Sequence, residues 1–419
     1  MSLLSTQAEI TTLGEIVSRT GGAIQTGPFG SQLHASDYTP VGTPLIMPIN
    51  LGDNEIVEKG IARVGNWDAR RLRRHALREG DIIFSRRGDV GRRSIVRAGQ
   101  VGWLCGTGCL AARFGSNRST VNPEYVAHYL GSRPAQAWLQ DNAVGGTMPN
   151  LNTAILSALP VRLPPRADQD AIVTALEDAQ ETIEHIKYLT AKTRAIRYGL
   201  IQQLLTGNVR LAGFGETWRT ARLGDLLKQP PRYGINAPAI PYSIGAHTYI
   251  RITDIDNAGN FAPHPKVGVR HSNAADYLLG KGELVFARTG ASVGKSYLYN
   301  PDDGELVYAG FLINIAPDPK ALDPAYLALV AQTAQYWDWV ARTSVRSGQP
   351  GINGREYAQL QIALPEISEQ RAIASTVSDA SREIYALDER LFKAKAVKQG
   401  MMQQLLTGRT RLPVKESAA

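Results

Sequence analysis

The stretch Gln202-Gln203-Leu204-Leu205-Thr206-Gly207 returns later in the chain as Gln403-Gln404-Leu405-Leu406-Thr407-Gly408, at an offset of 403 − 202 = 201 residues. Upstream of it, Gln169-Asp170-Ala171-Ile172 returns as Gln370-Arg371-Ala372-Ile373, again at 370 − 169 = 201. A biased composition would not hold one offset over this span, so the repeat indicates a duplicated structural unit. Two similar units on one chain suit a protein that binds a two-part target.

The closely repeated blocks, residues 163–210 and 364–419, predict two long helices. Asp168 and Ser368 are the expected N-caps, and Gly207 and Gly408 stand where a left-handed C-terminal cap would fall. At 1.5 Å per residue the first helix would be roughly 55 Å long. Heptad spacing favours a coiled coil between the two helices, although each could instead pack only on its own globular domain. The recurring positions are Ile172, Leu176, Ala179, Ile183, Ile186, Thr190, Thr193, Ile196, Leu200 and Leu204, and Ile373, Val377, Ala380, Ile384, Leu387, Leu391, Ala394, Val397, Met401 and Leu405.

The segments before these blocks, residues 1–162 and 211–363, diverge more and predict two α/β domains. Residues 80–88 of the first align with residues 282–290 of the second, and each reads as a turn, a short apolar strand and a basic glycine-containing loop. Between such anchors the two segments differ strongly. One scaffold with two sets of loops is what two different recognition targets require.

Composition indicates a globular protein with an anionic partner. Of the 419 residues 43% are hydrophobic, the formal net charge is +8 and the pI is about 9.4. No apolar run is long enough to span a bilayer, and the two cysteines, Cys105 and Cys109, are typical of reduced thiols in a cytosolic protein. A cluster of arginines favours nucleic-acid contact: Arg70, Arg71, Arg73, Arg74, Arg78, Arg86, Arg87, Arg92, Arg93 and Arg97.

Several stretches resemble catalytic motifs but lack an essential part. Residues 290–296, Gly-Ala-Ser-Val-Gly-Lys-Ser, have three residues between the glycines where a phosphate-binding P-loop needs four. Gln229-Pro230-Pro231-Arg232 has no aromatic residue to stack on a flipped base, as an amino-methyltransferase would require. The seven histidines show no metal-binding spacing. The sequence therefore predicts a chain without catalytic, metal or cofactor sites of its own.

The recognition candidates are polar and basic residues on glycine-rich loops. Arginine, asparagine and glutamine can contact base edges, whereas lysine, arginine and serine suit phosphates, as expected for Arg288 and Lys295. Asn150, Asn152 and Asn353 fit turn formation equally well, and Tyr233 fits a core aromatic equally well. The candidates for DNA contact are Ser31, Gln32, Arg86, Arg87, Arg92, Arg93, Thr147, Asn150 and Asn152 in the first half, and Arg232, Tyr233, Asn236, Arg288, Ser292, Lys295, Arg346, Gln349 and Asn353 in the second.

Taken together, these features make the chain resemble the specificity subunits of Type I restriction-modification systems. The resemblance rests on residues 27–31 (Gly-Pro-Phe-Gly-Ser), 146–152 (Gly-Thr-Met-Pro-Asn-Leu-Asn) and 288–295 (Arg-Thr-Gly-Ala-Ser-Val-Gly-Lys). It also rests on the Leu-Pro-Pro and Leu-Pro-Glu stretches at 163–165 and 364–366, which lead into the helices. The first half departs from the family's basic loop at Arg87 and Asp89.

The resemblance implies an α/β (α+β) fold with two target-recognition domains and a pseudo-two-fold internal repeat. Two long antiparallel helices would form a coiled coil that sets the spacer of a bipartite, asymmetric DNA target. Two modification subunits and the restriction subunits would dock on the chain and would bring S-adenosylmethionine, ATP and Mg with them. The residues expected in the coiled coil and in partner docking are Ile183, Ile186, Leu200, Leu204, Ile384, Leu387, Met401 and Leu405.

Two other functions stay open at this point. A self-sufficient DNA methyltransferase or nuclease would need catalytic motifs that the sequence does not show. A coiled-coil scaffold without DNA function would not need the paired basic glycine loops.

Overall fold

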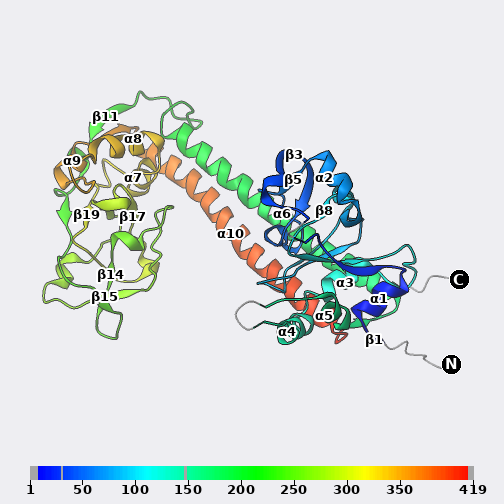
Figure 1. The fold of residues 1–419 in the computed structure, drawn as a ribbon. Coiled ribbons are helices and arrows are strands. Elements are labelled where there is room, and N and C mark those ends of the chain that lie inside the picture. The colour runs from blue at the N-terminus through cyan, green and yellow to red at the C-terminus, as the bar shows by residue number, and fades with distance from the viewer. Residues whose placement is uncertain (1–7, 30–31, 146–148, 414–419) are drawn as a thin grey trace. The chain divides into compact units, whose positions relative to one another are not determined.

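The computed structural model describes residues 8–29, 32–145 and 149–413, and it divides into two compact units (Figure 1). Unit 1 comprises residues 1–186 and 390–419, and unit 2 comprises residues 187–389. Each unit contains a domain of mixed helix and sheet together with parts of the two long helices α6 (Arg166–Leu204) and α10 (Ile367–Leu406). The mixed fold with an internal repeat is confirmed. The compact units, however, cut both helices, so they differ from the four sequence segments.

The domain of unit 1 is built on a five-stranded sheet of order β2-β9-β6-β7-β4, beside a three-stranded sheet of order β5-β3-β8. Its central strand β6 is buried along its whole length and pairs antiparallel with β7 and β9. The burial of Cys105 and Cys109 raises the pKa of both thiols, that of Cys105 to about 12. The elements are β1 (Glu9–Thr12), α1 (Leu13–Arg19), β2 (Ala23–Thr26), β3 (Tyr38–Ile46), β4 (Asp53–Asn54), β5 (Ala62–Val64), α2 (Asn66–Arg71), β6 (Ile82–Ser85), β7 (Arg93–Ile95), β8 (Leu104–Cys105), β9 (Cys109–Arg113), α3 (Pro123–Tyr129), α4 (Arg133–Asn142), α5 (Thr153–Ala158) and β10 (Pro160–Leu163).

The domain of unit 2 repeats this plan with two four-stranded sheets, β12-β19-β16-β17 and β13-β15-β14-β18. Its strand β16 is the counterpart of β6, is equally buried, and pairs antiparallel with β17 and β19. The elements are β11 (Arg219–Arg222), β12 (Arg232–Tyr233), β13 (Ile240–Pro241), β14 (His247–Ile250), β15 (Val267–Val269), β16 (Leu284–Ala287), β17 (Ser296–Leu298), β18 (Leu306–Tyr308), β19 (Leu312–Ile315), α7 (Pro324–Val330), α8 (Ala334–Thr343), α9 (Gly354–Ala358) and β20 (Gln361–Leu364).

Each domain is closed by a two-stranded antiparallel ribbon next to the long helices. In unit 1, β1 pairs with β10 and Glu9 lies opposite Leu163. In unit 2, β11 pairs with β20 and Arg219 lies opposite Leu364. The chain therefore enters and leaves each domain at one place.

Helix α6 begins directly after Pro165, two residues before Asp168, and α10 begins two residues after Pro365, one residue before Ser368. The expected N-caps are therefore wrong, because both residues lie inside the first helical turn. Gly207 and Gly408 have φ of 72° and 73°, which confirms the left-handed turns after the two helices.

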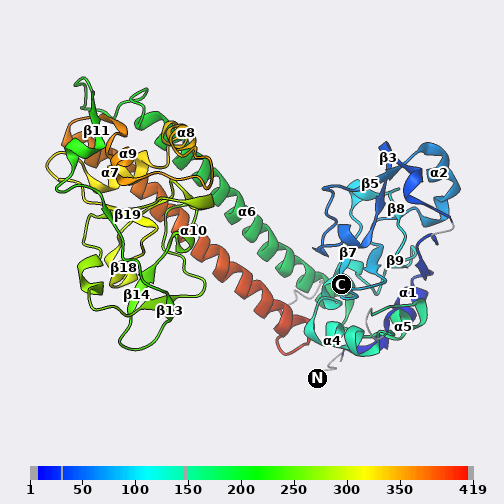
Figure 2. The ribbon, with the colours of Figure 1, turned by 60° about the vertical axis from the view of Figure 1, so that its left-hand side comes forward.

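The helices lie side by side and antiparallel within each unit (Figures 1 and 2). In unit 1 the Nζ of Lys398 donates to Gln180 over 2.6 Å, and in unit 2 the guanidinium of Arg194 lies 2.8 Å from Asp388. Of the expected seam residues, Ile183, Ile186, Leu204, Leu387 and Leu405 are buried, and Leu200, Ile384 and Met401 are partly buried.

The expected heptad pattern is offset by one residue in the C-terminal part of each long helix. Ile196 and Val397 were expected there, but both are at least half exposed. Arg197 and Lys398 take their places, at equivalent positions of the repeat (398 − 197 = 201). Arg197 donates to Ser381 over 2.8 Å and to Gln332 over 2.9 Å, while Lys398 donates to Gln180. Burial lowers the pKa of both cations, so each seam carries a half-buried charge with hydrogen-bond partners.

The glutamines that open the sequence repeat are buried anchors. Gln169 accepts from the backbone N–H of Asn122 over 2.8 Å, and its amide donates to the carbonyls of Thr120 and Pro164. Gln370 does the same in unit 2, as its side chain joins the loop before α7 to the start of α10. Both side chains are fully buried. The glutamine that recurs in the sequence repeat therefore has the same role in both units, because its side chain satisfies three buried backbone groups in each.

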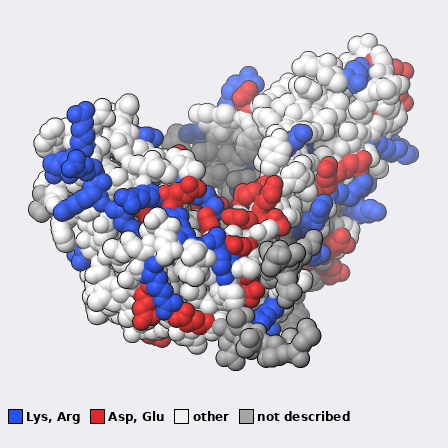
Figure 3. Space-filling view, turned by 90° about the vertical axis from the view of Figure 1, so that its right-hand side faces the viewer, with Lys and Arg blue, Asp and Glu red and all other residues white. Residues whose placement is uncertain are grey.

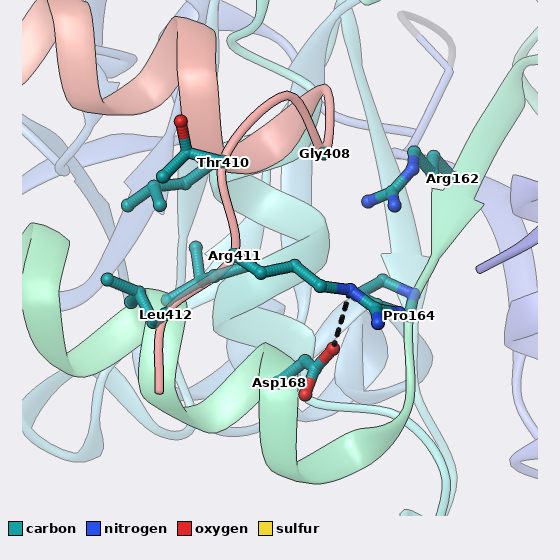
Figure 4. A pocket seen from close by; sticks show the side chains of 9 residues that line it. Arg162, Pro164, Asp168, Gly408, Thr410, Arg411 and Leu412 are labelled. Atoms are coloured by element: carbon teal, nitrogen blue, oxygen red, sulfur yellow. Dashed lines mark ion pairs between the residues drawn. The ribbon is translucent and has the colours of Figure 1, made fainter. Parts of the chain in front are cut away.

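The segment that follows each long helix is tied to the first turn of the other. In unit 2, Arg210 forms two hydrogen bonds of 2.6 and 2.7 Å with Glu369. In unit 1, the equivalent Arg411 lies 3.9 Å from Asp168, and the two side chains point toward each other beside Arg162 and Gly408 (Figure 4). Glu369 and Asp168 both lie in the first turn of a long helix, where the positive end of the helix dipole stabilises a carboxylate.

Candidate nucleic-acid interface

Equivalent hydrogen bonds bring the predicted recognition loops together in each unit. In unit 1 the N–H of Gly27 donates to Cys109 and that of Arg86 donates to Gly108. In unit 2 the N–H of Gly234 donates to Leu312 and that of Arg288 donates to Phe311. The loop after the first sheet strand, the basic loop and the turn before β9 or β19 therefore share one surface in each unit.

In unit 2 this surface is hollowed into a cavity of about 700 Å³. Three predicted DNA-contact residues, Tyr233, Asn236 and Arg288, line it. Sequence reasoning missed Arg251 and Phe311, which also line it. Cations, aromatic faces and amides on one concave surface suit a nucleic-acid strand.

Arg288 and Tyr233 form the best-defined pair in this cavity. The guanidinium carbon of Arg288 stands 4.7 Å from the centre of the Tyr233 ring, within cation–π range. The Tyr233 hydroxyl accepts from the N–H of Gly354, which fixes the ring. Among the residues that the structure describes, the Arg288 guanidinium has no hydrogen bond or ion pair. Tyr233 is 44% exposed, so the core-aromatic interpretation is wrong.

Most other candidates in unit 2 have local partners. Lys295 donates to the carbonyl of Ile255, the Nη2 of Arg346 donates to both carboxylate oxygens of Glu356, and Arg232 donates to the carbonyl of Asp276. Asn353 caps α9, as the turn interpretation predicted. Gln349 is exposed, and Ser292 is partly buried at the end of a short 3-10 turn.

In unit 1 the candidates divide between surface and interior. Arg87 is exposed, whereas Arg86, Arg92, Asn150 and Gln32 are partly buried. Gln32 accepts from Arg74, the backbone of Asn150 bridges to Arg87, and Asn152 caps α5. Ser31 and Thr147 lie outside the described residues.

Arg93 is a correction to the predicted DNA-contact set. Its side chain is 5% exposed and donates to the carbonyl of Ala127 over 2.9 Å and to Asp53 over 3.0 Å. A buried, paired guanidinium holds strand β7 against α3 and is not accessible to DNA.

The arginines near α2 remain on the surface. Arg70, Arg73 and Arg74 are exposed, whereas Arg71 pairs with Asp68 and Arg97 with Glu124. Figure 3 looks onto unit 1 and shows a group of basic side chains at its left edge, whereas acidic and basic side chains lie among one another toward the middle. The charge on this face is therefore divided, although the chain as a whole is basic.

His128 supports a pH prediction for unit 1. Burial, with Lys398 and Arg93 nearby, lowers the pKa of His128 to about 3, and its ring contacts Asn54. Between pH 6.5 and 3 the unfolded chain takes up a proton that the folded unit does not, so stability falls as pH falls. We expect a loss of about 2 kcal/mol from this group between pH 7 and 5.

Residue 329, the equivalent position in unit 2 (128 + 201), is leucine, which supplies the matched variant His128→Leu. Urea unfolding at pH 7 and pH 5 should show a smaller pH effect in this variant than in the parent chain. Equal pH effects in the two proteins would contradict the prediction.

In the part of the chain that the structure describes, no three His, Cys, Asp or Glu side chains are grouped to hold a metal ion. The described helices include none with the length and apolar character needed to cross a membrane.

Comparisons with known proteins identify the family of this chain. The Type I restriction modification DNA specificity domain matches residues 65–192 and 216–391. The MjaX type I restriction enzyme specificity subunit of Methanocaldococcus jannaschii is 25% identical over 201 residues, which span 46% of each chain. Thus the aligned region covers about half the length of this relative.

Solved structures share the fold over nearly the whole chain. A Type I restriction-modification S subunit from M. genitalium matches with a TM-score of 0.56 and 13% identity, over 97% of this chain and 98% of that one. A chain from a structural study of complex assembly in a type I R-M system matches with a TM-score of 0.60 and 18% identity, over 97% and 99%. At these identities the likeness concerns the fold alone.

Proposed function

Since the chain belongs to the family of Type I restriction-modification specificity subunits, we propose that it reads a bipartite, asymmetric DNA target, with one half-site bound by each unit. The observation that carries this proposal is the pair of equivalent loop surfaces with different side chains. Gly27 and Gly234 occupy equivalent places, yet the residues around them differ. One scaffold with two loop sets supports two different half-sites rather than a palindrome.

The proposal assigns no chemistry to this chain. Modification subunits would supply the methyl transfer with S-adenosylmethionine, and restriction subunits would supply ATP- and Mg-dependent cleavage. The family match favours this division over a self-sufficient methyltransferase or nuclease.

Methylome sequencing tests the whole proposal. A host that carries this chain with its modification subunit should show adenine methylation at one motif with two unlike halves and a fixed spacer. A palindromic motif, or methylation that persists without this chain, would contradict it.

Arg288 is the residue most suited to a DNA phosphate, because it is held in place by Tyr233 and has an unengaged guanidinium. Arg288→Ala should weaken binding to all duplexes by about 10- to 100-fold and lower the salt slope by about one. Lys320→Ala removes the same charge from an exposed position outside the cavity and serves as the control. Fluorescence anisotropy at several salt concentrations measures both quantities. A changed sequence preference with an unchanged slope would instead indicate base contact.

Most of the helix residues predicted for docking are buried or partly buried, and Leu200, Leu204, Met401 and Leu405 pack against the domain cores, so they offer little surface to a partner. Large apolar side chains are exposed elsewhere on the helices, where they fit a protein partner better. These side chains are Tyr188, Ile196, Tyr198, Tyr385, Phe392 and Val397.

We expect Phe392→Asp, in unit 1, and Tyr385→Asp, in unit 2, each to weaken the binding of one modification subunit by about 30-fold, the effect of losing a binding hot spot. Mass measurement of the purified complex should then give one bound modification subunit in place of two. Retention of two subunits by both variants would rule out docking at these residues.

A further inference from the structure

The cavity of unit 2 contains an aromatic residue that the fold does not require. Phe311 is 60% exposed at the turn between β18 and β19, where it lines the same cavity as Asn236. An exposed phenylalanine contributes little to the stability of the domain. Its backbone, not its ring, makes the structural contact, because its carbonyl accepts from the N–H of Arg288 over 3.0 Å.

Unit 1 shows that this position tolerates a residue without a side chain. The equivalent carbonyl, which accepts from the N–H of Arg86, belongs to Gly108. In unit 1 the exposed aromatic instead lies two residues after Gly27, at Phe29, which is 55% exposed. Two residues after the equivalent Gly234, unit 2 has Asn236. Each unit thus offers one exposed phenylalanine at this surface, from a different loop.

The remaining lining of the cavity matches one chemical class of ligand. Tyr233 adds a second aromatic ring to the lining, and Asn236 provides both a donor and an acceptor. Aromatic rings and guanidinium planes are the surfaces on which unstacked bases lie, while amides read base edges. The volume of about 700 Å³ falls in the range of small-ligand sites.

We propose that this cavity accepts one nucleobase that leaves the duplex stack when DNA binds, with Phe311 supplying the stacking face. This inference rests on the proposed function, since it assigns a particular contact within the half-site of unit 2. It makes Phe311 a specificity residue, because the cost of extruding a base depends on which base pair is opened.

A mismatch scan tests the inference with the full-length chain assembled with its modification subunits. The target is first selected from a randomised duplex library. Single mismatches are then introduced at each target position, which lowers the cost of extruding that base. The methylated adenines are set aside, because a methyltransferase extrudes its own substrate. At one further position the mismatch should tighten binding about 10-fold.

Phe311→Gly places at this position the residue that unit 1 has, Gly108. In this variant the mismatched duplex should bind no more than about 2-fold more tightly than the matched one. Binding of the matched target should weaken by about 5- to 100-fold, the effect expected for one lost stacking contact. Phe311→Tyr should retain the gain. Ile244→Gly truncates a fully exposed apolar residue of unit 2 outside the cavity and serves as the control.

The outcomes separate the two proposals. If the complex selects no duplex from the library, the proposed function fails. If it selects a bipartite target but no mismatch gain depends on Phe311, only the base-accepting cavity is overturned. A loss of affinity in Phe311→Gly without any mismatch gain in the parent chain also overturns it, because it would indicate surface contact with a stacked duplex.

Discussion

Lengthening α6 and α10 together by seven residues each is expected to move methylation to a target with the same half-sites and a spacer longer by about three base pairs. Seven residues add about 10 Å of helix, and DNA rises by about 3.4 Å per base pair. Seven residues make about two helical turns, so the insertion rotates the facing sides of the helices by only about 20°. Methylation at the original target should fall at least about 100-fold, because losing one half-site removes several base contacts.

Both helices must be lengthened because each passes from one unit to the other and is fixed to its neighbour on both sides. In unit 1 the fixed pair is Gln180 with Lys398, and in unit 2 it is Arg194 with Asp388. Duplicating residues 184–190 and 385–391 places the insertions between these pairs. Methylome sequencing reads the new spacer.

Insertion into α6 alone is the matched control, and it should abolish methylation at both spacers, since it forces the two pairs out of register. An unchanged spacer in the doubly lengthened chain would show that the helices do not set the distance between half-sites.

Gln370→Leu is expected to lower the free energy of unfolding of unit 2 by about 3–5 kcal/mol. The substitution keeps the volume but leaves the N–H of Asp323 and the carbonyls of Ala321 and Pro365 buried without their partner. Each such group costs about 1–3 kcal/mol. Gln370→Glu should destabilise the unit as well, because a carboxylate cannot donate to two carbonyls.

Amide hydrogen exchange measures this effect where it arises. The N–H of Asp323 should exchange faster in both variants, and amides elsewhere in unit 2 should follow if the whole unit is destabilised. Gln203→Leu, an exposed glutamine on α6, supplies the control and should change exchange little. Unaltered protection of the Asp323 amide in Gln370→Leu would show that the buried glutamine does not stabilise this junction.

The sequence predicted the features that depend on local spacing. The 201-residue offset located both long helices and both left-handed glycines, and the aligned stretches 80–88 and 282–290 located the central buried strands. These features follow from hydrophobic periodicity and turn chemistry, which act over a few residues.

Features that depend on distant partners could not be predicted. Heptad counting selected Ile196, but Arg197 faces the seam because Ser381 and Gln332 accept its hydrogen bonds from 184 and 135 residues away. Arg93 looked like one more surface cation until the fold placed Asp53 beside it. The exposure of Phe311 could not be predicted from the sequence, because an apolar residue beside a strand is normally expected to be buried in the core.

The two antiparallel ribbons have an evolutionary consequence. Because β1 pairs with β10 and β11 with β20, a related domain can replace the segment between the strands of a ribbon, and Gln169 and Gln370 can bind it in the same way because they contact only its backbone groups. Homologous exchange between related genes, with crossovers at the ribbon-coding segments, would then transfer a complete half-site in one event. A lineage could acquire new DNA specificities by recombination of whole domains, without passing through the unstable intermediates that stepwise core substitution would produce.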